Sequence, residues 1–114
     1  MAYTNVHRMA RISPLKVRQV CNLIRGRTAA EARTILAMNK KRGAAFVATA
    51  LDAAIANADQ QEADVRSLRV TDARVDSGPT IKRFQPKDRG RAHPILKRTS
   101  HITVSVDVPV DADA

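Results

Sequence analysis

The sequence is poor in cysteine and in aromatic residues. Its 114 residues include one cysteine, one tyrosine, two phenylalanines and no tryptophan. A single cysteine, Cys21, excludes an internal disulfide framework and a cysteine-based zinc cluster. Because Cys21 falls on the apolar stripe of a predicted helix, we expect a small buried hydrophobic residue rather than a reactive thiol.

The features of a membrane protein are also missing. No apolar run approaches the ~20 residues that a membrane span needs, and the first residues, MAYTNVHRMARIS, lack the apolar stretch of a signal peptide. The scarcity of aromatic residues argues against a protein that lies on a membrane surface. We therefore expect a cytoplasmic protein with no membrane partner.

Residues that could support catalysis or metal binding do not cluster in the sequence. His7, His93 and His101 lie far apart, with no carboxylate at a metal-ligand spacing. Ser100 and His101 with Asp107 fit the polar face of a strand better than a catalytic triad. There is no glycine-rich loop of the kind that cradles phosphates. We predict no enzyme activity, no catalytic residue, no metal site, no cofactor and no small-molecule substrate.

Acidic residues are few beside the basic ones. Lysine and arginine number 20 and aspartate and glutamate 11, which gives a formal net charge of +9 and a pI near 10.8. A surplus of this size indicates a polyanionic partner. The chain is short enough for one domain, residues 1–114, and its apolar content is ordinary for a folded protein.

Apolar residues at helical spacing predict three helices. Ser13 and Pro14 fit the N-cap and first position of a helix over residues 14–25, which Gly26 can end. Thr28 and Glu31 form a capping box at the start of a helix over 29–38. The third and longest helix follows 39-NKKRG-43 and has its apolar face between residues 44 and 58. Its many alanines imply close packing against neighbouring elements.

Alternating patterns predict strands on either side of these helices. Residues 2–10 fit an edge strand, and 60–64 reads as a loop. From Val65 the period becomes two, with a change of phase that suggests a bulge near Asp72. The clearest alternation runs from His101 to Val108. The acidic tail 107–114 is expected to be frayed and flexible.

The segment 78-GPTIKRFQPKDRGRAHPILKR-98 separates two of these strands and is too basic to bury itself. We predict that both strands continue outward as a β-hairpin over residues 76–101, turning at Asp88-Arg89-Gly90 and reaching roughly 40 Å from the body. Phe84 could stack on an unpaired base or cover its neighbour in the hairpin. A disordered basic loop is the simpler interpretation, which the flanking strand patterns disfavour.

Basic residues of both body and hairpin are candidates for phosphate contact. Taken singly, each could equally be a solvated surface charge, but together they indicate a nucleic acid that touches both parts. In the body they are Arg8, Arg11, Lys16, Arg18, Arg25, Arg27, Lys40 and Lys41, with Arg42 beside the last two. In the hairpin they are Lys82, Arg83, Lys87, Arg89, Arg91, Lys97 and Arg98.

Three runs, 16-KVRQVCNLIRGR-27, 53-AAIANADQ-60 and 75-VDSGPTIKRFQPKDRGRAHPILKRTSHITVSV-106, resemble the family of the large-subunit ribosomal protein numbered twenty-two, in its bacterial or organellar form. The resemblance implies an α+β fold in which three helices pack on a small antiparallel three-stranded sheet, with a long protruding β-hairpin. It also implies a structural role in the large ribosomal subunit, early assembly, and contacts with several domains of 23S-type rRNA and with neighbouring ribosomal proteins.

In that family the hairpin lines the polypeptide exit tunnel, so its tip would meet the nascent chain near the site of macrolide antibiotics. We place Phe84, Pro86, Asp88 and Gly90 at this tip, and of these Pro86 and Gly90 match the family pattern; the resemblance also adds Ser100 and His101 to the rRNA-binding set. The other matching residues are Lys16, Arg18, Arg25, Gly26, Gly78, Pro79, Lys82, Arg83, Arg91, Lys97 and Arg98. The sequence departs from the family pattern at Lys87-Asp88, where relatives have arginine and a small residue.

An architectural DNA-binding protein of the nucleoid type is the alternative hypothesis. Such proteins grip the minor groove with β-ribbon arms and wedge a proline between bases, a role open to Pro86 or Pro94. They depend on a dimeric body, whereas the basic residues of this chain mark several faces and suggest that RNA surrounds it.

Overall fold

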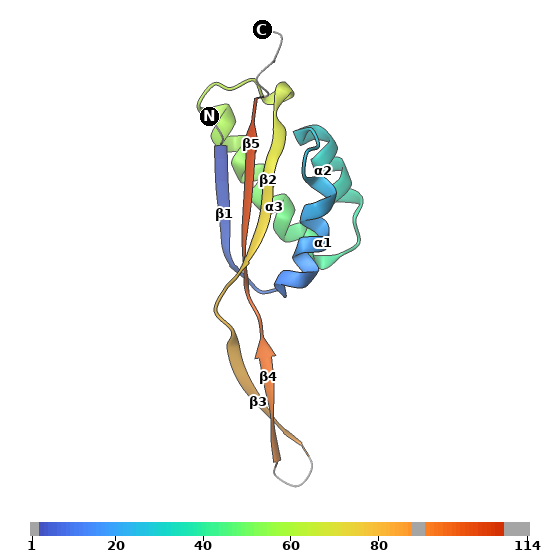
Figure 1. The fold of residues 1–114 in the computed structure, drawn as a ribbon, viewed down its shortest axis with the longest axis vertical. Coiled ribbons are helices and arrows are strands. Elements are labelled where there is room, and N and C mark those ends of the chain that lie inside the picture. The colour runs from blue at the N-terminus through green and yellow to red at the C-terminus, as the bar shows by residue number, and fades with distance from the viewer. Residues whose placement is uncertain (1–2, 88–90, 109–114) are drawn as a thin grey trace.

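A computed structural model describes residues 3–87 and 91–108, with the side chains of 84–87 and 91–95 left out of the description. The fold is α+β, as the sequence predicts: helices pack on a small antiparallel sheet from which a strand pair protrudes (Figure 1). In chain order the elements are β1 (Tyr3–Ala10), α1 (Pro14–Ile24), α2 (Ala29–Met38), α3 (Arg42–Gln60), a 3-10 turn η1 (Val65–Ser67), β2 (Arg69–Ser77), β3 (Ile81–Lys87), β4 (Arg91–Lys97) and β5 (Ser100–Asp107).

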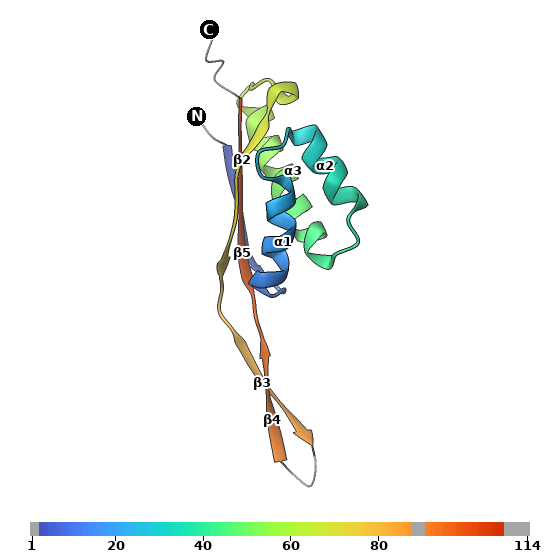
Figure 2. The same ribbon diagram turned by 45° about the vertical axis from the view of Figure 1, so that its right-hand side comes forward.

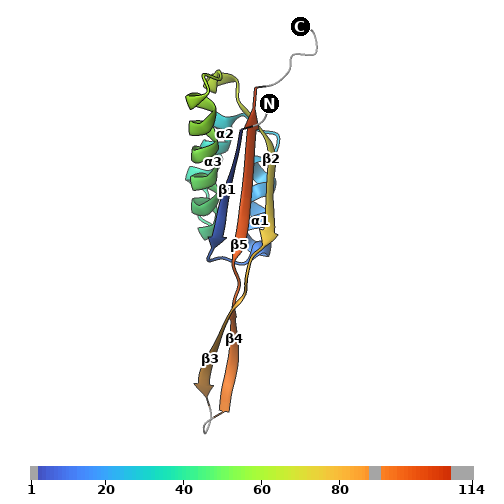
Figure 3. The ribbon, with the colours of Figure 1, turned by 90° about the vertical axis from the view of Figure 1, so that its left-hand side faces the viewer.

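The body consists of one sheet with helices on one face only. The strand order is β1-β5-β2, and both pairings are antiparallel. In the described chain the opposite face of the sheet carries no helix (Figure 3). The predicted bulge near Asp72 is present, because the register between β2 and β5 shifts between Val70 and Asp72.

The core lies between this sheet and the helices. Ile24, Leu51 and Leu68 are fully buried beside Ile102, Val104 and Val106 of the central strand. On α3 the buried positions include four alanines, Ala44, Ala50, Ala54 and Ala58. Small side chains let α3 approach its neighbours closely, so the packing expected from the alanine-rich face is present.

The helix ends mostly follow their sequence signals. Gly26 has φ +82°, a left-handed conformation that suits glycine just past a helix end. The Thr28 hydroxyl accepts a hydrogen bond from the N–H of Glu31 at 3.2 Å, which is the forward half of the predicted capping box. Ser13 occupies the N-cap and Pro14 the first helical position, but the Ser13 side chain makes no capping hydrogen bond.

Two predicted boundaries are wrong. The strand does not begin at Val65, because Val65–Ser67 forms a 3-10 turn and β2 starts at Arg69. Asp64 holds this turn by accepting from the Arg66 N–H at 3.2 Å and the Ser67 hydroxyl at 2.7 Å. The apolar residues Val65 and Leu68 are three apart, a spacing that a turn of helix satisfies as well as a strand does. The third helix also runs further than its apolar face, from Arg42 to Gln60.

The central strand β5 is buried on both faces rather than on one. Thr103 and Ser105 belong to the face without helices, yet they are only 5% and 7% exposed. Strands flank them on either side, and the Ser105 hydroxyl lies 2.9 Å from that of Thr4 on β1. Because β5 lies between two strands, their side chains cover Thr103 and Ser105, although the alternating sequence pattern predicts that these two residues face solvent.

The hairpin extends the molecule along its long axis. β3 and β4 pair antiparallel from Ile81 opposite Lys97 to Lys87 opposite Arg91, and they form a sheet of their own. The longest dimension is 70 Å, against 24 and 21 Å for the others (Figure 2). The turn at Asp88-Arg89-Gly90 and most of the tail, residues 109–114, lie outside the described residues.

Cys21 is fully buried on α1, and burial raises the pKa of its thiol to about 11. We therefore expect the native protein to react with a thiol reagent at pH 8 at least about a hundredfold more slowly than a free cysteine, because little thiolate forms and access is blocked. Stopped-flow labelling would measure this rate. A Leu96→Cys variant supplies an exposed thiol as the control, and equal rates at the two positions would contradict a buried Cys21.

Candidate RNA-binding surface

The body and the hairpin meet at a short junction, here called the hairpin root: residues 78–80 and 98–99. The hydrogen-bond ladder between the two segments of the chain is interrupted here, and the two segments cross over as they pass from β2 and β5 into β3 and β4 (Figures 1 and 3). The Gly78 N–H donates to the Thr99 carbonyl at 3.0 Å, and the Thr99 hydroxyl donates to the Pro79 carbonyl at 2.5 Å. These bonds join the two segments across the interruption.

Ser100 and His101, which follow the root on β5, both form hydrogen bonds within the protein. Ser100 is fully buried, and its hydroxyl donates to the Ile12 carbonyl at 2.6 Å. The Nδ1 atom of His101 accepts from the N–H of Met9 at 3.1 Å, where β1 departs from regular pairing. Both residues therefore have internal partners, and their assignment to rRNA contact stays a prediction.

Gly78 has no room for a side chain. A Cβ at this position would lie 2.5 Å from the Thr99 hydroxyl oxygen and 3.2 Å from Cε1 of His101. Thr99 is 2% exposed and hydrogen bonded to Pro79, so it cannot move away without losing that bond. Glycine is thus required at position 78 because the two segments of the root approach each other closely.

We expect Gly78→Ala to destabilise the protein by roughly 1–3 kcal/mol, through overpacking and loss of the Thr99 to Pro79 bond. Urea unfolding followed by circular dichroism would measure the change. Gly43→Ala is the matched control, because a Cβ there meets its nearest neighbour, Ile12, at an ordinary 3.4 Å and alanine favours the helix. A Gly78 variant as stable as the Gly43 variant would contradict the tight root.

Basic side chains converge beside the root. A pocket of about 560 Å³ lies where the segment after β1, the starts of α1 and α3, and the ends of both hairpin strands come together; we call it the root pocket. It is lined by Arg11, Ile12, Ser13, Lys16, Arg42, Ile81, Leu96, Lys97, Arg98 and Thr99. Four of the predicted RNA-binding residues, Arg11, Lys16, Lys97 and Arg98, are thereby brought together from distant parts of the sequence.

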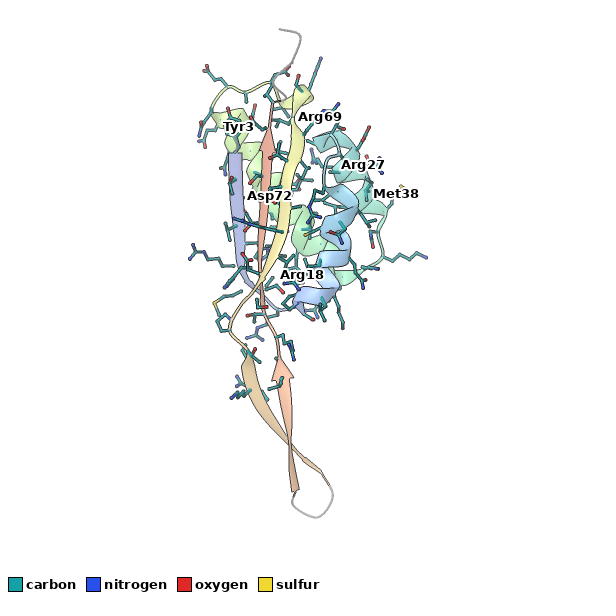
Figure 4. The ribbon with its side chains drawn as sticks, in the orientation of Figure 1. Tyr3, Arg18, Arg27, Met38, Arg69 and Asp72 are labelled. Carbon is teal, nitrogen blue, oxygen red and sulfur yellow. The ribbon has the colours of Figure 1, made fainter. Side chains whose placement is uncertain are left out.

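A second group of predicted residues covers the free edge of the sheet. β2 is an edge strand, and its outward carbonyls accept from the guanidinium groups of Arg18, at 3.2 Å from the Val75 oxygen, and of Arg25, at the Ala73 oxygen. The backbone of Arg27 pairs with Val70, accepting its N–H at 2.8 Å. Figure 4 labels Arg18 on α1 and Arg27 in the segment between α1 and α2.

These contacts give Arg18 and Arg25 a structural role that the sequence did not reveal. An edge strand with unpaired carbonyls would be open to association with another strand, and arginine side chains block it. Both side chains remain largely exposed. Contact of their remaining donors with RNA stays a prediction.

Of the remaining body residues, Lys40 and Lys41 are neighbours just before α3, whereas Arg8 lies elsewhere. Lys41 donates from Nζ to Gln19 Oε1 at 2.7 Å, near the start of α3. Lys40 is exposed in the preceding loop. Arg8 lies on the sheet face without helices, where it lines a separate pocket of about 460 Å³ with Met9 and His101.

Along the hairpin, Lys82 and Arg83 on β3 and Lys97 on β4 are exposed, as is Arg98 just beyond it. Lys87 and Arg91 pair at the far end of the strands, while Phe84 and Pro86 lie opposite Pro94 and Ala92. The side chains of these far residues are outside the described part, as are Asp88, Arg89 and Gly90 altogether.

The ion pairs found among the described side chains join Arg33 to Asp52 at 3.2 Å and Arg74 to Asp72 at 3.6 Å, and neither includes a candidate cation. No cluster of three metal-ligating side chains occurs among residues 3–87 and 91–108. Within the same ranges, none of the helices has the length and apolar character to span a membrane.

Comparison with known protein families gives one match that covers nearly all of this architecture. The model of the family described as ribosomal protein L22p/L17e matches residues 5–107, from β1 to the end of β5. The matched range includes the root pocket and both hairpin strands.

Proposed function

Because the chain belongs to the ribosomal protein L22p/L17e family and is therefore a structural protein of the large ribosomal subunit, we propose that it binds large-subunit rRNA through one continuous surface made by the hairpin and its root. The family is one of structural ribosomal proteins rather than enzymes. This membership favours the ribosomal interpretation over the architectural DNA-binding alternative.

The observation that carries the proposal is the placement of charge. Arg11, Lys16, Arg42, Lys97 and Arg98 surround the root pocket, and Lys82 and Arg83 continue the positive surface onto the hairpin. Cations that lack acidic partners raise the local positive potential and contact phosphates, releasing the counterions of the nucleic acid.

The hairpin itself requires a partner. A two-stranded ribbon has no second layer to pack against and is marginally stable alone. The core of the described chain ends at Val75 and resumes at Ile102, so the hairpin side chains described here contribute nothing to it. rRNA packed around the strands would supply the missing surface.

The remaining parts of the proposal concern place and timing. The hairpin crosses several rRNA domains of the 23S type, lines the exit tunnel with Phe84, Pro86, Asp88 and Gly90, and there meets the nascent polypeptide close to bound macrolides. Contacts with several rRNA domains make the protein an early assembly component beside neighbouring ribosomal proteins. The length of the hairpin, which extends the protein along its 70 Å axis, suits such a path.

Sedimentation of ribosomes from cells that carry a tagged copy of the chain would test the proposal. The tagged chain should sediment with the large subunit and remain there after a high-salt wash, because many phosphate contacts and an enclosed hairpin are lost only on disassembly. Recovery with DNA, or release by the wash, would contradict it.

A further inference from the structure

The root pocket has more room than a phosphate group needs. Its volume of about 560 Å³ falls within the ~300–1,000 Å³ of ordinary small-molecule sites. A smaller pocket of about 350 Å³ adjoins it, shares Ile12, Lys16 and Arg42, and continues to Gln19, Lys41 and Gly43. Together they form a groove from the hairpin to the start of α3.

The charge of this groove suits an anion at several points. None of the described residues that line it is acidic, and six are lysine or arginine: Arg11, Lys16, Lys41, Arg42, Lys97 and Arg98. Two helices also begin at the groove. Ser13 before α1 and Lys41 before α3 make no side-chain capping bond. Pro14 has no N–H, and the N–H groups of Lys16 and Ala44 already donate to the carbonyls of Ser13 and Lys41, so the first-turn N–H groups left for an anion are those of Leu15, Arg42 and Gly43.

The groove also has an apolar wall, which phosphate binding does not require. Ile12, Ile81 and Leu96 belong to its lining, and the register of the hairpin strands places Ile81 and Leu96 on opposite faces of the ribbon. Leu96 is 51% exposed, although it belongs to a segment with few apolar residues. Unstacked nucleobases, which RNA presents in loops and bulges, pack on arginine planes as well as on aromatic rings, and an exposed leucine beside arginines adds apolar area that such a base can cover.

A continuous RNA duplex does not fit these features as well. Its bases are stacked inside the helix, and proteins contact it across the shallow minor groove and the phosphates. A duplex would leave the exposed apolar side chain of Leu96 uncovered.

We propose that the root pocket holds one unstacked nucleotide of the bound rRNA, its base against Leu96 and its flanking phosphates on the cations and the two helix starts. This inference rests on the proposed function and specifies how part of that surface is used. The bound nucleotide would fix the position at which the hairpin enters the RNA.

Leu96→Ala truncates the exposed apolar side chain of this lining without changing charge. We expect it to weaken binding to a full-length 23S-type rRNA transcript about fivefold, because the apolar area that the base covers at Leu96 is lost, with the salt dependence unchanged. The matched control is Leu23→Ala, because Leu23 is 45% exposed on α1 and lies outside the pocket. Filter binding at several salt concentrations would measure the affinity and its salt dependence for both variants. Equal affinities of the two variants would overturn the proposal of a nucleotide in the root pocket.

Crosslinking through Leu96→Cys would identify the contact directly. The variant can be labelled selectively with a thiol-linked photo-crosslinker, because Cys21 is buried and holds its proton. We expect a crosslink to the base of an unpaired nucleotide, and protection of that base from chemical modification by the wild-type protein but less by Leu96→Ala. Crosslinks confined to the sugar and phosphate of paired nucleotides would overturn the inference.

The two levels of the proposal fail differently. A wild-type protein that does not bind the transcript would overturn rRNA binding and the pocket with it. Wild-type binding without a base contact at position 96 would overturn the pocket alone.

Discussion

Exchange of five hairpin cations for glutamine should lower rRNA affinity about a thousandfold at roughly 0.15 M salt. Each lost phosphate contact reduces the slope of log affinity against log salt by about 0.7–0.9, so five should reduce it by about 3.5–4.5. Counterion release contributes little to the affinity at about 1 M salt. Applying the reduced slope from there down to roughly 0.15 M gives the expected thousandfold loss of affinity. The five residues are Lys82, Arg83, Arg91, Lys97 and Arg98.

The control separates these positions from charge in general. Arg33, Arg66 and Arg74 lie outside the candidate surface, and two of them pair with aspartates. Their exchange for glutamine should change the slope less per residue than the hairpin exchange does. Filter binding from low to high salt would provide both slopes, and a hairpin variant with the wild-type slope would remove the hairpin from the binding surface.

Replacement of residues 79–97 by an Asn-Gly turn should leave the body folded. The buried core of the described chain lies within residues 10–75 and 102–106, so the replacement removes none of it. It does remove the bond between Thr99 and Pro79, which contributes about 1 kcal/mol. We expect thermal unfolding to stay cooperative, with a midpoint within several degrees of the wild type.

The same variant should bind rRNA at least as weakly as the five-residue exchange, because it lacks the apolar wall and most of the hairpin charge. Calorimetry and filter binding on one preparation would test both statements. A chain that fails to fold would show that the hairpin is part of the core, whereas a folded chain with wild-type affinity would place the binding surface elsewhere.

Local signals in the sequence predict most of the fold. The capping residue Thr28, the glycine after α1 and the apolar spacing of α1 and α2 all act within a few residues, and the structure agrees with them. The turn at Val65–Ser67 was missed because its apolar spacing fits two structures, and only the Asp64 capping bonds distinguish them.

The use of individual side chains could not be predicted in the same way. Arg18 and Arg25 read as surface charges, but they bond to carbonyls of β2 some fifty residues later. Ser100 read as a polar strand residue and proved to be a buried link to Ile12. The root pocket could not be predicted either. Its cations were recognised one by one in the sequence, but the fold alone brings them together with Ile81 and Leu96, where β1, α1, α3 and the hairpin meet.

The strand order constrains how the protein can be synthesised and folded. β5 is the centre of the sheet, and it pairs with β1 at residues separated by almost the whole chain, such as Tyr3 and Val106. Because β5 follows the hairpin in the sequence, the sheet cannot close until residues 78–99 have been translated. Contacts of such long sequence separation also slow folding. The helices therefore cannot pack on a complete sheet until β5 is available. During synthesis the long basic hairpin emerges from the ribosome before β5 does, and so before the body can finish folding.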